Sequence, residues 1–520
     1  MSFNKFLLIS AVIFFTVFLL PKISWAANHY ICDTSVCGQT PGDGLSWTTA
    51  LADLPTTFTR GDTYYVADGS YTSHVFSTPV SGSTYITVKK ATAADHGADT
   101  GWSNSFGDGQ AVLADSIQFT SSYWIFDGNG THTVPSNNSA DYGFKVLKTV
   151  SSWTGVIKIG NGSSAISNIT IKYTHSFNTY HAKNVVSSDT INVRFYGYAG
   201  GKHSYIKIQN NFLENSGQDG IQTSGANYLL FERNYTKWLG ELGAHLPPLP
   251  DYHGQTFSNY PGGGADVIYR YNVFESCEGE ALISIFGPSG TPARIRFYGN
   301  LIYNPYGVYT ASAGYNSGIV HYWAEGANPP DGLYFYNNTV VNSAGTYDLL
   351  DGVGHHTPKS MWLLDSSATN AYLYNNLLYD SHTNIAIGWN SHGYHASGGG
   401  DTAGGTNEQT GLTSSIFTNY TGNNFRLTSN TTAGLNLTTQ PWWSGGADSF
   451  FGTIDSEVDA YGVTRTTWSR GAYEYAGSGP APFCGDTVCN GAETCSTCVQ
   501  DCGVCPDTTP PSAPSGVAVS

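Results

Sequence analysis

Short runs of alternating apolar and polar residues recur along most of the chain, and turns rich in glycine, asparagine and serine separate them. Examples are TYYV (63–66), YITVKK (85–90) and SNITIKY (167–173). Alternation with a period of two is typical of strands that bury one face, and Gly-rich clusters mark the turns between them. No amphipathic helical period of useful length interrupts these runs. The pattern therefore predicts an all-β protein.

From residue 208 the strand pattern repeats, and each repeat carries an asparagine directly after a β-rich run. The spacings between these asparagines are 23, 38, 28, 38 and 38 residues. The shortest fits one coil of three short strands, and the longer ones need loop insertions of up to about fifteen residues. Equivalent residues of a parallel solenoid stack about 4.8 Å apart, so the asparagine amides of successive coils can bond one another. The repeat predicts a parallel β-solenoid in which these residues are scaffold: Asn211, Asn234, Asn272, Asn300, Asn338 and Asn376.

This pattern resembles the right-handed parallel β-helix superfamily, of which pectate lyases are familiar members. The resemblance covers roughly residues 60 to 478, and the segment VDAYGVTRTTWSRGAYEY (458–475) is similar to the end common in secreted β-helix proteins. It departs from that end at Ser469-Arg470, where an acidic-aliphatic pair commonly stands. The resemblance implies an all-β fold, a right-handed parallel β-helix.

The chain divides into five segments. We expect a signal peptide (1–26), an N-terminal cap (27–60), the β-helix (61–478), a cysteine-rich module (479–506) and a linker with the truncated start of a fibronectin type III-like module (507–520). Lys5 precedes the apolar run FLLISAVIFFTVFLL, and Ala26 ends a stretch of small residues suited to cleavage. We therefore predict a secreted, extracellular or cell-surface protein without a membrane span after cleavage, and a monomer.

Nine cysteines occur, and export to an oxidising compartment permits disulfides. Cys32 and Cys37 are close enough to pair across a short loop, whereas Cys277 is expected to be a buried, inert thiol. The other six crowd into one stretch near the C-terminus. They predict a disulfide module of open connectivity, with a zinc site as the alternative because two CxxC pairs occur: Cys484, Cys489, Cys495, Cys498, Cys502 and Cys505.

The formal net charge is −16 and only 12% of residues are charged. A nucleic-acid-binding protein needs a basic face to neutralise phosphates, so this balance argues against nucleic acid as a partner. An acidic glycan would be repelled by the protein as a whole. Local lysines, arginines or a bound cation must then offset that repulsion.

Counting eight residues on from Asn211 and from Asn272 gives Asp219 and Glu280 as equivalent positions. The dipeptides Asp219-Gly220, His253-Gly254 and Glu280-Ala281 can also be matched, which places His253 in the same column of stacked residues. Adjacent strands bring the residues of such a column within about 5 Å of one another. A second alignment, of Gln222-Thr223 with Gln255-Thr256, moves His253 to the opposite face.

Two nearby carboxylates favour a bound cation or a raised pKa. Because Ca²⁺ prefers oxygen ligands, we predict a calcium site formed by Asp219, Glu278 and Glu280.

The segment VFESCEGEALISIFG (273–287) also resembles the corresponding strand of chondroitinase B and the alginate lyases that share its β-helix. That resemblance implies calcium-binding glutamates and a lysine that abstracts the C5 proton of a uronate. Here Gly279-Glu280-Ala281-Leu282 retains one glutamate, and Ile285, Phe286 and Gly287 stand where the lysine would be.

A lyase of uronate polymers needs a base and a group that neutralises the carboxylate. With the usual lysine absent, we predict His253 or His321 as the base, and Arg270 and Lys237 as cationic catalytic groups. Aromatic faces suit sugar rings, so Trp238 and Tyr252 are predicted to bind substrate. Gln222 and Gln255 complete the predicted substrate-binding set.

The leading functional interpretation is an exported enzyme that cleaves an extracellular acidic polysaccharide by β-elimination. One alternative is a non-catalytic glycan-binding or adhesin-type surface protein, which the missing lysine favours. The other is a glycoside hydrolase with paired carboxylates at Asp219 and Glu280, since the separation of two carboxylates sets that mechanism.

Overall fold

The computed structural model describes residues 26–475 apart from 151–153, 180–190, 198–200, 217–218, 224–225, 240–254, 260–263, 278–280, 289–291, 305–317, 326–330, 343–361, 365–368, 382–388, 390 and 402–404. The predicted signal sequence up to residue 25, the cysteine-rich module and the C-terminal tail lie outside the described residues. So do Tyr252, His253, Glu278 and Glu280. No helix in the described part of the chain has the length and apolar character needed to cross a membrane.

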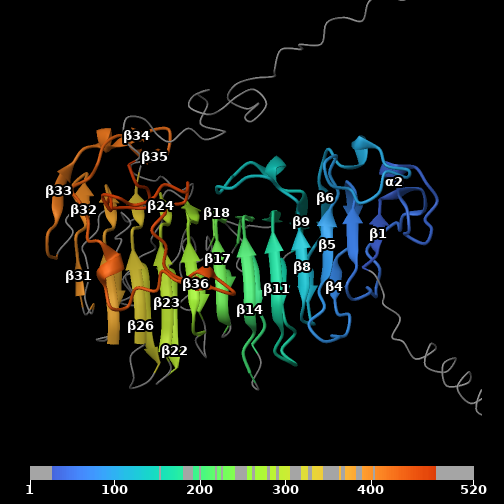
Figure 1. Cartoon of the computed structure of the whole chain (residues 1–520), viewed down its shortest axis with the longest axis horizontal. Coiled ribbons are helices and arrows are strands. Elements are labelled where there is room, and N and C mark those ends of the chain that lie inside the picture. Colours follow the sequence, from blue (N-terminus) through green and yellow to red (C-terminus); the bar gives the residue numbers. More distant parts are fainter. Residues whose placement is uncertain are drawn as a thin grey trace, which may run out of the picture.

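Three long parallel sheets run the length of the molecule, and successive coils add strands to them in chain order (Figure 1). Sheet A contains β1 (Asn28–Ile31), β2 (Thr63–Val66), β5 (Ile86–Lys90), β8 (Trp124–Asp127), β11 (Ser167–Lys172), β14 (Ser204–Gln209), β17 (Asn227–Glu232), β20 (Val267–Arg270), β23 (Pro292–Tyr298), β26 (Asp331–Tyr336), β29 (Thr369–Tyr374) and β31 (Ser391–Gly393).

Sheet B contains β3 (Gly69–Tyr71), β6 (Ala111–Ala114), β9 (Phe144–Lys148), β12 (Thr174–Asn178), β15 (Phe212–Glu214), β18 (Tyr235–Lys237), β21 (Val273–Glu275), β24 (Leu301–Tyr303), β27 (Thr339–Val341), β30 (Leu377–Tyr379), β32 (Ala396–Gly398) and β33 (Gln409–Leu412). Sheet C contains β4 (His74–Phe76), β7 (Ile117–Phe119), β10 (Ile157–Ile159), β13 (Val193–Phe195), β16 (Asp219–Gln222), β19 (Gln255–Asn259), β22 (Ala281–Pro288), β25 (Gly318–Glu325) and β28 (Trp362–Leu364). The predicted all-β parallel β-helix is confirmed.

Inward-facing apolar side chains stack from coil to coil and fill the interior. On sheet C, Ile157 pairs in register with Ile117 and Val193, and all three are fully buried. Aromatic rings extend such columns on sheet A, where Phe297 and Phe335 stack with ring centroids 5.4 Å apart. Burying a side chain of this size contributes about 1.5–3 kcal/mol, so the repeated column supplies the main driving force for coiling.

The six repeat asparagines form a continuous ladder of buried amides, as predicted. The Nδ2 groups of the first five asparagines each donate to the Oδ1 atom of the next asparagine, at 3.0 to 3.2 Å. Each Oδ1 atom of the ladder after the first also accepts the backbone N–H of the preceding asparagine, at 2.9 to 3.1 Å. The ladder therefore satisfies both side-chain and backbone groups at the turn between sheets A and B.

At its C-terminal end the ladder continues with a histidine instead of an asparagine. The backbone N–H of Asn376 donates to Nδ1 of His395 at 3.2 Å, so a histidine takes the place of a seventh asparagine. His395 is fully buried, and Arg470 donates to its backbone carbonyl. Burial, together with the nearby His392 and Arg470, lowers the pKa of His395 to about 3.

The parallel coils end before residue 413, and a returning segment follows them. The last parallel strand is β33, and residues 413–475 form two antiparallel hairpins and fold back along the outside. The hairpins are β34 (Phe417–Asn419) with β35 (Asn424–Leu427), and β36 (Ala447–Asp448) with β37 (Gly452–Thr453). Figure 1 shows this orange and red segment crossing the yellow and green strands. The range 61–478 expected for the β-helix thus includes this returning segment as well as the coils.

The closing motif of the sequence has a structural use. Asp459 accepts the backbone N–H groups of Tyr461, Val463 and Glu474 at 2.8 to 3.0 Å. Arg465 donates to the carbonyl of Ala472 at 2.7 Å. The aspartate and arginine of the D-x-x-G-x-x-R run thus tie the final turn to GAYEY.

The N-terminal segment adds a strand to the stack as well as covering its end. β1 pairs in parallel with β2 and is the terminal strand of sheet A, a strand that the weak pattern of residues 27–60 did not predict. The short helix α2 (Thr34–Cys37) follows, and Cys32 and Cys37 form the predicted disulfide. Cys277 is free and buried, and burial raises its thiol pKa to about 12, as expected of an inert thiol.

We predict that Asn272→Ala lowers the free energy of unfolding by about 3 kcal/mol, because the backbone N–H and the Nδ2 group of Asn234 lose their buried acceptor. Urea unfolding followed by circular dichroism measures the change. The exposed Asn430→Ala is the matched control, expected within about 0.5 kcal/mol of the wild type. Equal midpoints for the two variants would contradict a stabilising role of the ladder.

We also predict that His395→Asn makes the protein less sensitive to acid. The folded pKa of about 3 lies below the 6.5 of an ordinary histidine, so the unfolded chain binds more protons between these values and acid favours unfolding. His395 alone should cost about 2 kcal/mol of stability between about pH 7.5 and 5. Glu408, whose pKa burial raises to about 8, is present in both proteins, so the difference between their pH profiles isolates the histidine. Parallel profiles would refute the assignment.

Candidate active site

A row of polar residues follows the outer face of sheet C. In β7, β10 and β13, the middle residue lies between two buried apolar residues and so points outward. The strand register aligns these middle residues with one position of each following strand through β25. We call this set the outer row of sheet C: Gln118, Lys158, Arg194, Gln222, Ser258, Ser284 and His321.

Lys158 and Arg194 are neighbours on adjacent strands and carry the positive charge of the row. Both are half-buried, and the guanidinium of Arg194 lies over the ring of Tyr196, 4.9 Å from its centroid. Burial lowers the pKa of Lys158, although the carboxylate of Asp115 acts in the opposite direction. A lysine whose pKa is lowered loses its proton more readily, which is a requirement for a lysine base.

A second lysine lies near this pair. Lys148, at the end of β9, has a fully buried side chain, and its Nζ atom donates to the carbonyl and the hydroxyl of Thr154 at 2.8 and 2.9 Å. Burial lowers its pKa to about 8, and the charge of Lys158 acts in the same direction. Oδ1 of Asp115 lies 4.0 Å from Nζ of Lys148, so a carboxylate accompanies the two lysines.

The register of sheet C corrects the predicted column. Asp219 pairs with Gln255, and Gln255 pairs with Ala281, so Asp219 and Glu280 are not equivalent positions. The second alignment is also wrong, because Gln222 pairs with Ser258. The core residues Ile221, Phe257 and Ile283 fix the register by stacking inward, whereas the turns that precede these strands differ in length.

Asp219 is buried and accepts a hydrogen bond from Nε2 of Gln222 at 3.2 Å. It is the one predicted calcium ligand within the described residues, which therefore supply a single carboxylate of the predicted set. In the described part of the chain, no three His, Cys, Asp or Glu side chains are grouped so as to hold a metal ion. The calcium site stays a prediction.

The two predicted residues from β18 and the turn after it lie away from the outer row of sheet C. Lys237 belongs to sheet B, where its Nζ atom is 3.0 Å from Oε1 of Glu275. The same Nζ atom lies 4.4 Å from the ring centroid of Trp238. The structure therefore brings Lys237 and Trp238 together, next to a carboxylate, while Gln222 and the register position of His321 belong to the outer row.

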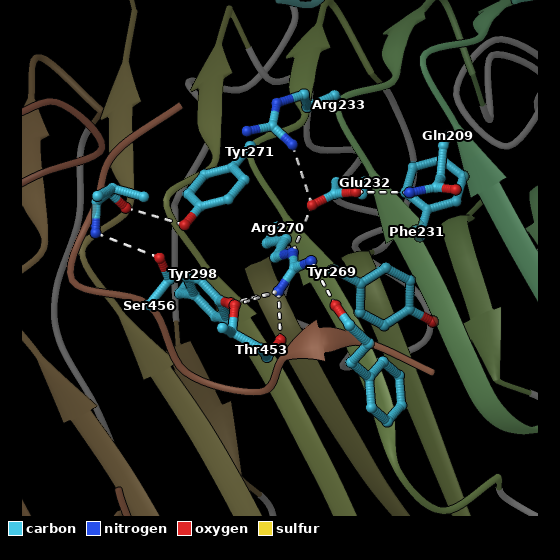
Figure 2. A network of polar contacts seen from close by, with 12 residues as sticks. Gln209, Phe231, Glu232, Arg233, Tyr269, Arg270, Tyr271, Tyr298, Thr453 and Ser456 are labelled. Atoms are coloured by element: carbon cyan, nitrogen blue, oxygen red, sulfur yellow. Dashed lines mark hydrogen bonds and ion pairs between the residues drawn. The ribbon is translucent and has the colours of Figure 1, made fainter. Parts of the chain in front are cut away.

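Arg270 lies on sheet A, under the returning C-terminal segment (Figure 2). Its Nε atom donates to Glu232 at 2.7 Å, and its terminal nitrogens donate to the carbonyls of Thr453 and Phe451 at 2.5 and 2.9 Å. Burial acts to raise the pKa of Glu232, but Arg270 and Arg233 outweigh it and hold that pKa below its usual value. This position favours a structural role for Arg270 and argues against the predicted neutralisation of a substrate.

The sequence analysis missed Gln118, Lys158 and Arg194. A signal was present, because each is a polar residue between two apolar ones in IQF, IKI and VRF. These segments precede Asn211, and without an asparagine in each coil the sequence offered no repeat with which to align them. The strand pairing supplies that alignment.

Comparison with protein-family models finds no match, and no curated protein matches the sequence. Among solved structures, the chain is similar to an alginate lyase from Paenibacillus sp. str. FPU-7, with 12% identity and a TM-score of 0.32 over 68% of this chain and 89% of that one. It is also similar to a mutant of the PL6 family alginate lyase AlyGC, with 10% identity and a TM-score of 0.31 over 90% of this chain and 61% of that one. The chain thus spans about three fifths of the length of the second structure.

We predict that Arg270→Met destabilises the protein by about 3–5 kcal/mol, because it leaves the buried carboxylate of Glu232 without its main partner. Arg294→Met is the matched control. Arg294 also pairs with an acid on the neighbouring coil, Asp266, but its side chain is 42% exposed, so we expect a loss of at most about 1 kcal/mol. Urea unfolding compares the two variants, and equal losses would contradict the anchoring role of Arg270.

Proposed function

We propose that this protein is a polysaccharide lyase that binds an acidic glycan along the outer row of sheet C. The observation that carries the proposal is the composition of that row. Its seven register positions hold two cations, a histidine and four neutral hydrogen-bonding residues, and none of them is acidic. In a chain with 38 acidic and 22 basic residues, such a row is a local site for a polyanion.

A linear polymer suits this geometry because the row is itself linear. Neighbouring positions of the row lie about 4.8 Å apart along the stack of coils. Successive sugar residues of one polysaccharide chain therefore meet successive side chains. Gln118 and Gln222 flank the cationic pair in the register. Their Nε2 groups donate to Gly160 and Asp219, and their amide oxygens can accept from sugar hydroxyls. Acidic sugars bind opposite Lys158 and Arg194.

The reaction follows from the two cations. Arg194 neutralises the uronate carboxylate through its planar guanidinium, which lowers the pKa of the adjacent C5–H. Lys158, on the next strand and with a lowered pKa, removes the C5 proton, and the glycosidic oxygen leaves from C4 as the double bond forms. His321 stands four strands from Arg194 in the register, about 19 Å away, so it serves a sugar bound further along the row.

A calcium ion at Asp219, Glu278 and Glu280 belongs to the proposal as a further aid to binding. Bound there, it would supply positive charge close to Gln222 and so extend the favourable field along the row. The non-catalytic alternative requires only that the same row bind a glycan without proton transfer. A measurement of product formation distinguishes the lyase from the non-catalytic glycan-binding protein.

We predict that the purified protein releases unsaturated products from at least one of alginate, pectate and chondroitin, measured by ultraviolet absorbance with and without Ca²⁺. Lys158→Met and Arg194→Gln should each lower kcat/KM by about 100-fold or more, because each removes a group that acts on the reacting sugar. Lys172→Met is the matched control. This half-exposed lysine pairs with Asp127 on sheet A at 3.0 Å, and its loss should leave activity unchanged.

Two outcomes would count against the proposal in different ways. Glycan binding without any absorbance change on the full panel would identify a binding protein. Full activity of Lys158→Met and Arg194→Gln would show that the reaction takes place elsewhere on the molecule.

A further inference from the structure

A serine, a histidine and a glutamate from three parts of the chain form a hydrogen-bonded series on sheet B. The Oγ atom of Ser139 lies 2.8 Å from Nδ1 of His175, and Nε2 of His175 lies 2.9 Å from Oε2 of Glu214. Ser139 begins the 3-10 turn η3 (Ser139–Asp141), whereas His175 and Glu214 come from the paired strands β12 and β15. The outer row of sheet C contains none of these residues.

The surroundings hold the imidazole in one orientation. Its ring stacks on Phe212, the residue opposite it in the register, with centroids 4.6 Å apart and planes 12° from parallel. Only 2% of His175 is exposed. An ionised carboxylate can only accept, so Nε2 carries the hydrogen that donates to Glu214 and Nδ1 is free to accept from the hydroxyl of Ser139.

The serine is positioned by the loop between β8 and β9. Nε2 of Gln110 donates to the backbone carbonyls of Ser139 and Tyr142, at 2.6 and 2.7 Å, and so fixes both ends of η3. Ser139 is half-buried and its neighbours Asn138 and Ala140 are exposed, so this loop borders solvent. A small substrate can therefore approach the hydroxyl from outside while the histidine and glutamate stay in the protein.

We propose that Ser139, His175 and Glu214 form a second catalytic site, which hydrolyses short acyl esters such as an acetyl group on a sugar hydroxyl. A serine nucleophile, a neutral histidine base and a carboxylate that orients the base make up a constellation that is recognised by geometry on unrelated folds. The roles of the two ring nitrogens are exchanged relative to the serine-protease pattern. The chemistry requires only that one nitrogen accept from the serine and the other donate to the acid.

The reaction consumes one ester and one water. Oγ of Ser139 attacks the carbonyl carbon while Nδ1 of His175 takes the hydroxyl proton. The tetrahedral intermediate collapses, the C–O bond to the alcohol breaks, and the histidine gives its proton to the departing alcohol. Water then attacks the acyl-serine with His175 again as base, and the carboxylic acid leaves as the serine hydroxyl is restored.

The alternative is a purely structural role, in which the three residues only hold the loop against sheet B. Burial lowers the pKa of His175, against the opposing effect of Glu214. A catalytic histidine of this kind remains an effective base at a lower pH than an ordinary histidine does. A docking contact predicts no esterase activity at any pH.

The experiment uses the purified full-length protein, with p-nitrophenyl acetate as substrate and a fluorophosphonate as an active-site label. We expect hydrolysis above the buffer rate, labelling at Ser139, and a loss of at least about 100-fold in Ser139→Ala. Glu214→Gln should reduce kcat and move the acidic limb of the pH profile, because the carboxylate no longer stabilises the protonated imidazole. Ser136→Ala is the control: this serine lies in the same loop and bonds Asp141.

Circular dichroism and urea unfolding of each variant establish that it is folded. No hydrolysis and no labelling in the wild type would overturn the proposal and leave the docking role. Hydrolysis that survives in Ser139→Ala would overturn it as well, because another group would then be the nucleophile. Neither result depends on whether the outer row of sheet C cleaves a glycan.

Discussion

The amide ladder from Asn211 to Asn376 is the interaction on which the rest of the structure depends. Its buried amides bond the side chain and the backbone of the neighbouring coil at once, so two neighbouring coils have one relative position in which these ladder groups are paired. That position aligns the strands of sheets A and B on either side of the ladder. Once the register is fixed, side chains at equivalent positions stand in straight rows on the outside, and the functional rows follow from the scaffold.

The three sheets use their outer faces differently. Sheet A is covered by the C-terminal segment, where Arg296 and Tyr336 both bond Asp455. Sheet B carries the series from Ser139 to Glu214 and, further along, the hairpin β34–β35 against Tyr303 and Tyr379. Sheet C presents the row that holds Lys158 and Arg194. Sheet A thus anchors the C-terminal segment, whereas sheet B carries both a packed hairpin and a polar series.

The sequence predicts the fold well because its signals survive insertions. Period-two alternation is local to each strand, and an asparagine after a strand keeps its meaning whatever loop length follows. Register in sheet C is different, because it depends on the turn before each strand. Eight residues separate Asn211 from Asp219, but nine separate Asn272 from Ala281, which is the equivalent position in the register, so counting eight from the asparagine placed Glu280 one position out.

The location of Arg270 was unpredictable for another reason. A sequence shows which residue precedes an asparagine, but not that a segment some 180 positions later returns to cover it. Ser139, His175 and Glu214 likewise lie on separate coils, and each alone resembles an ordinary polar residue of a turn or a strand. Only the stacking of the coils brings them within hydrogen-bond distance.

The returning C-terminal segment also changes how such a molecule comes apart. A stack of coils touching only their neighbours is quasi-one-dimensional and unravels from its ends, one coil at a time. Here residues 451 to 472 bond Arg270, Tyr298, Tyr336 and Thr339, which belong to three successive coils. Peeling the last coils away requires the whole segment to detach first, so the C-terminal half opens as a unit. Gradual fraying is thereby replaced by a single, rarely crossed barrier.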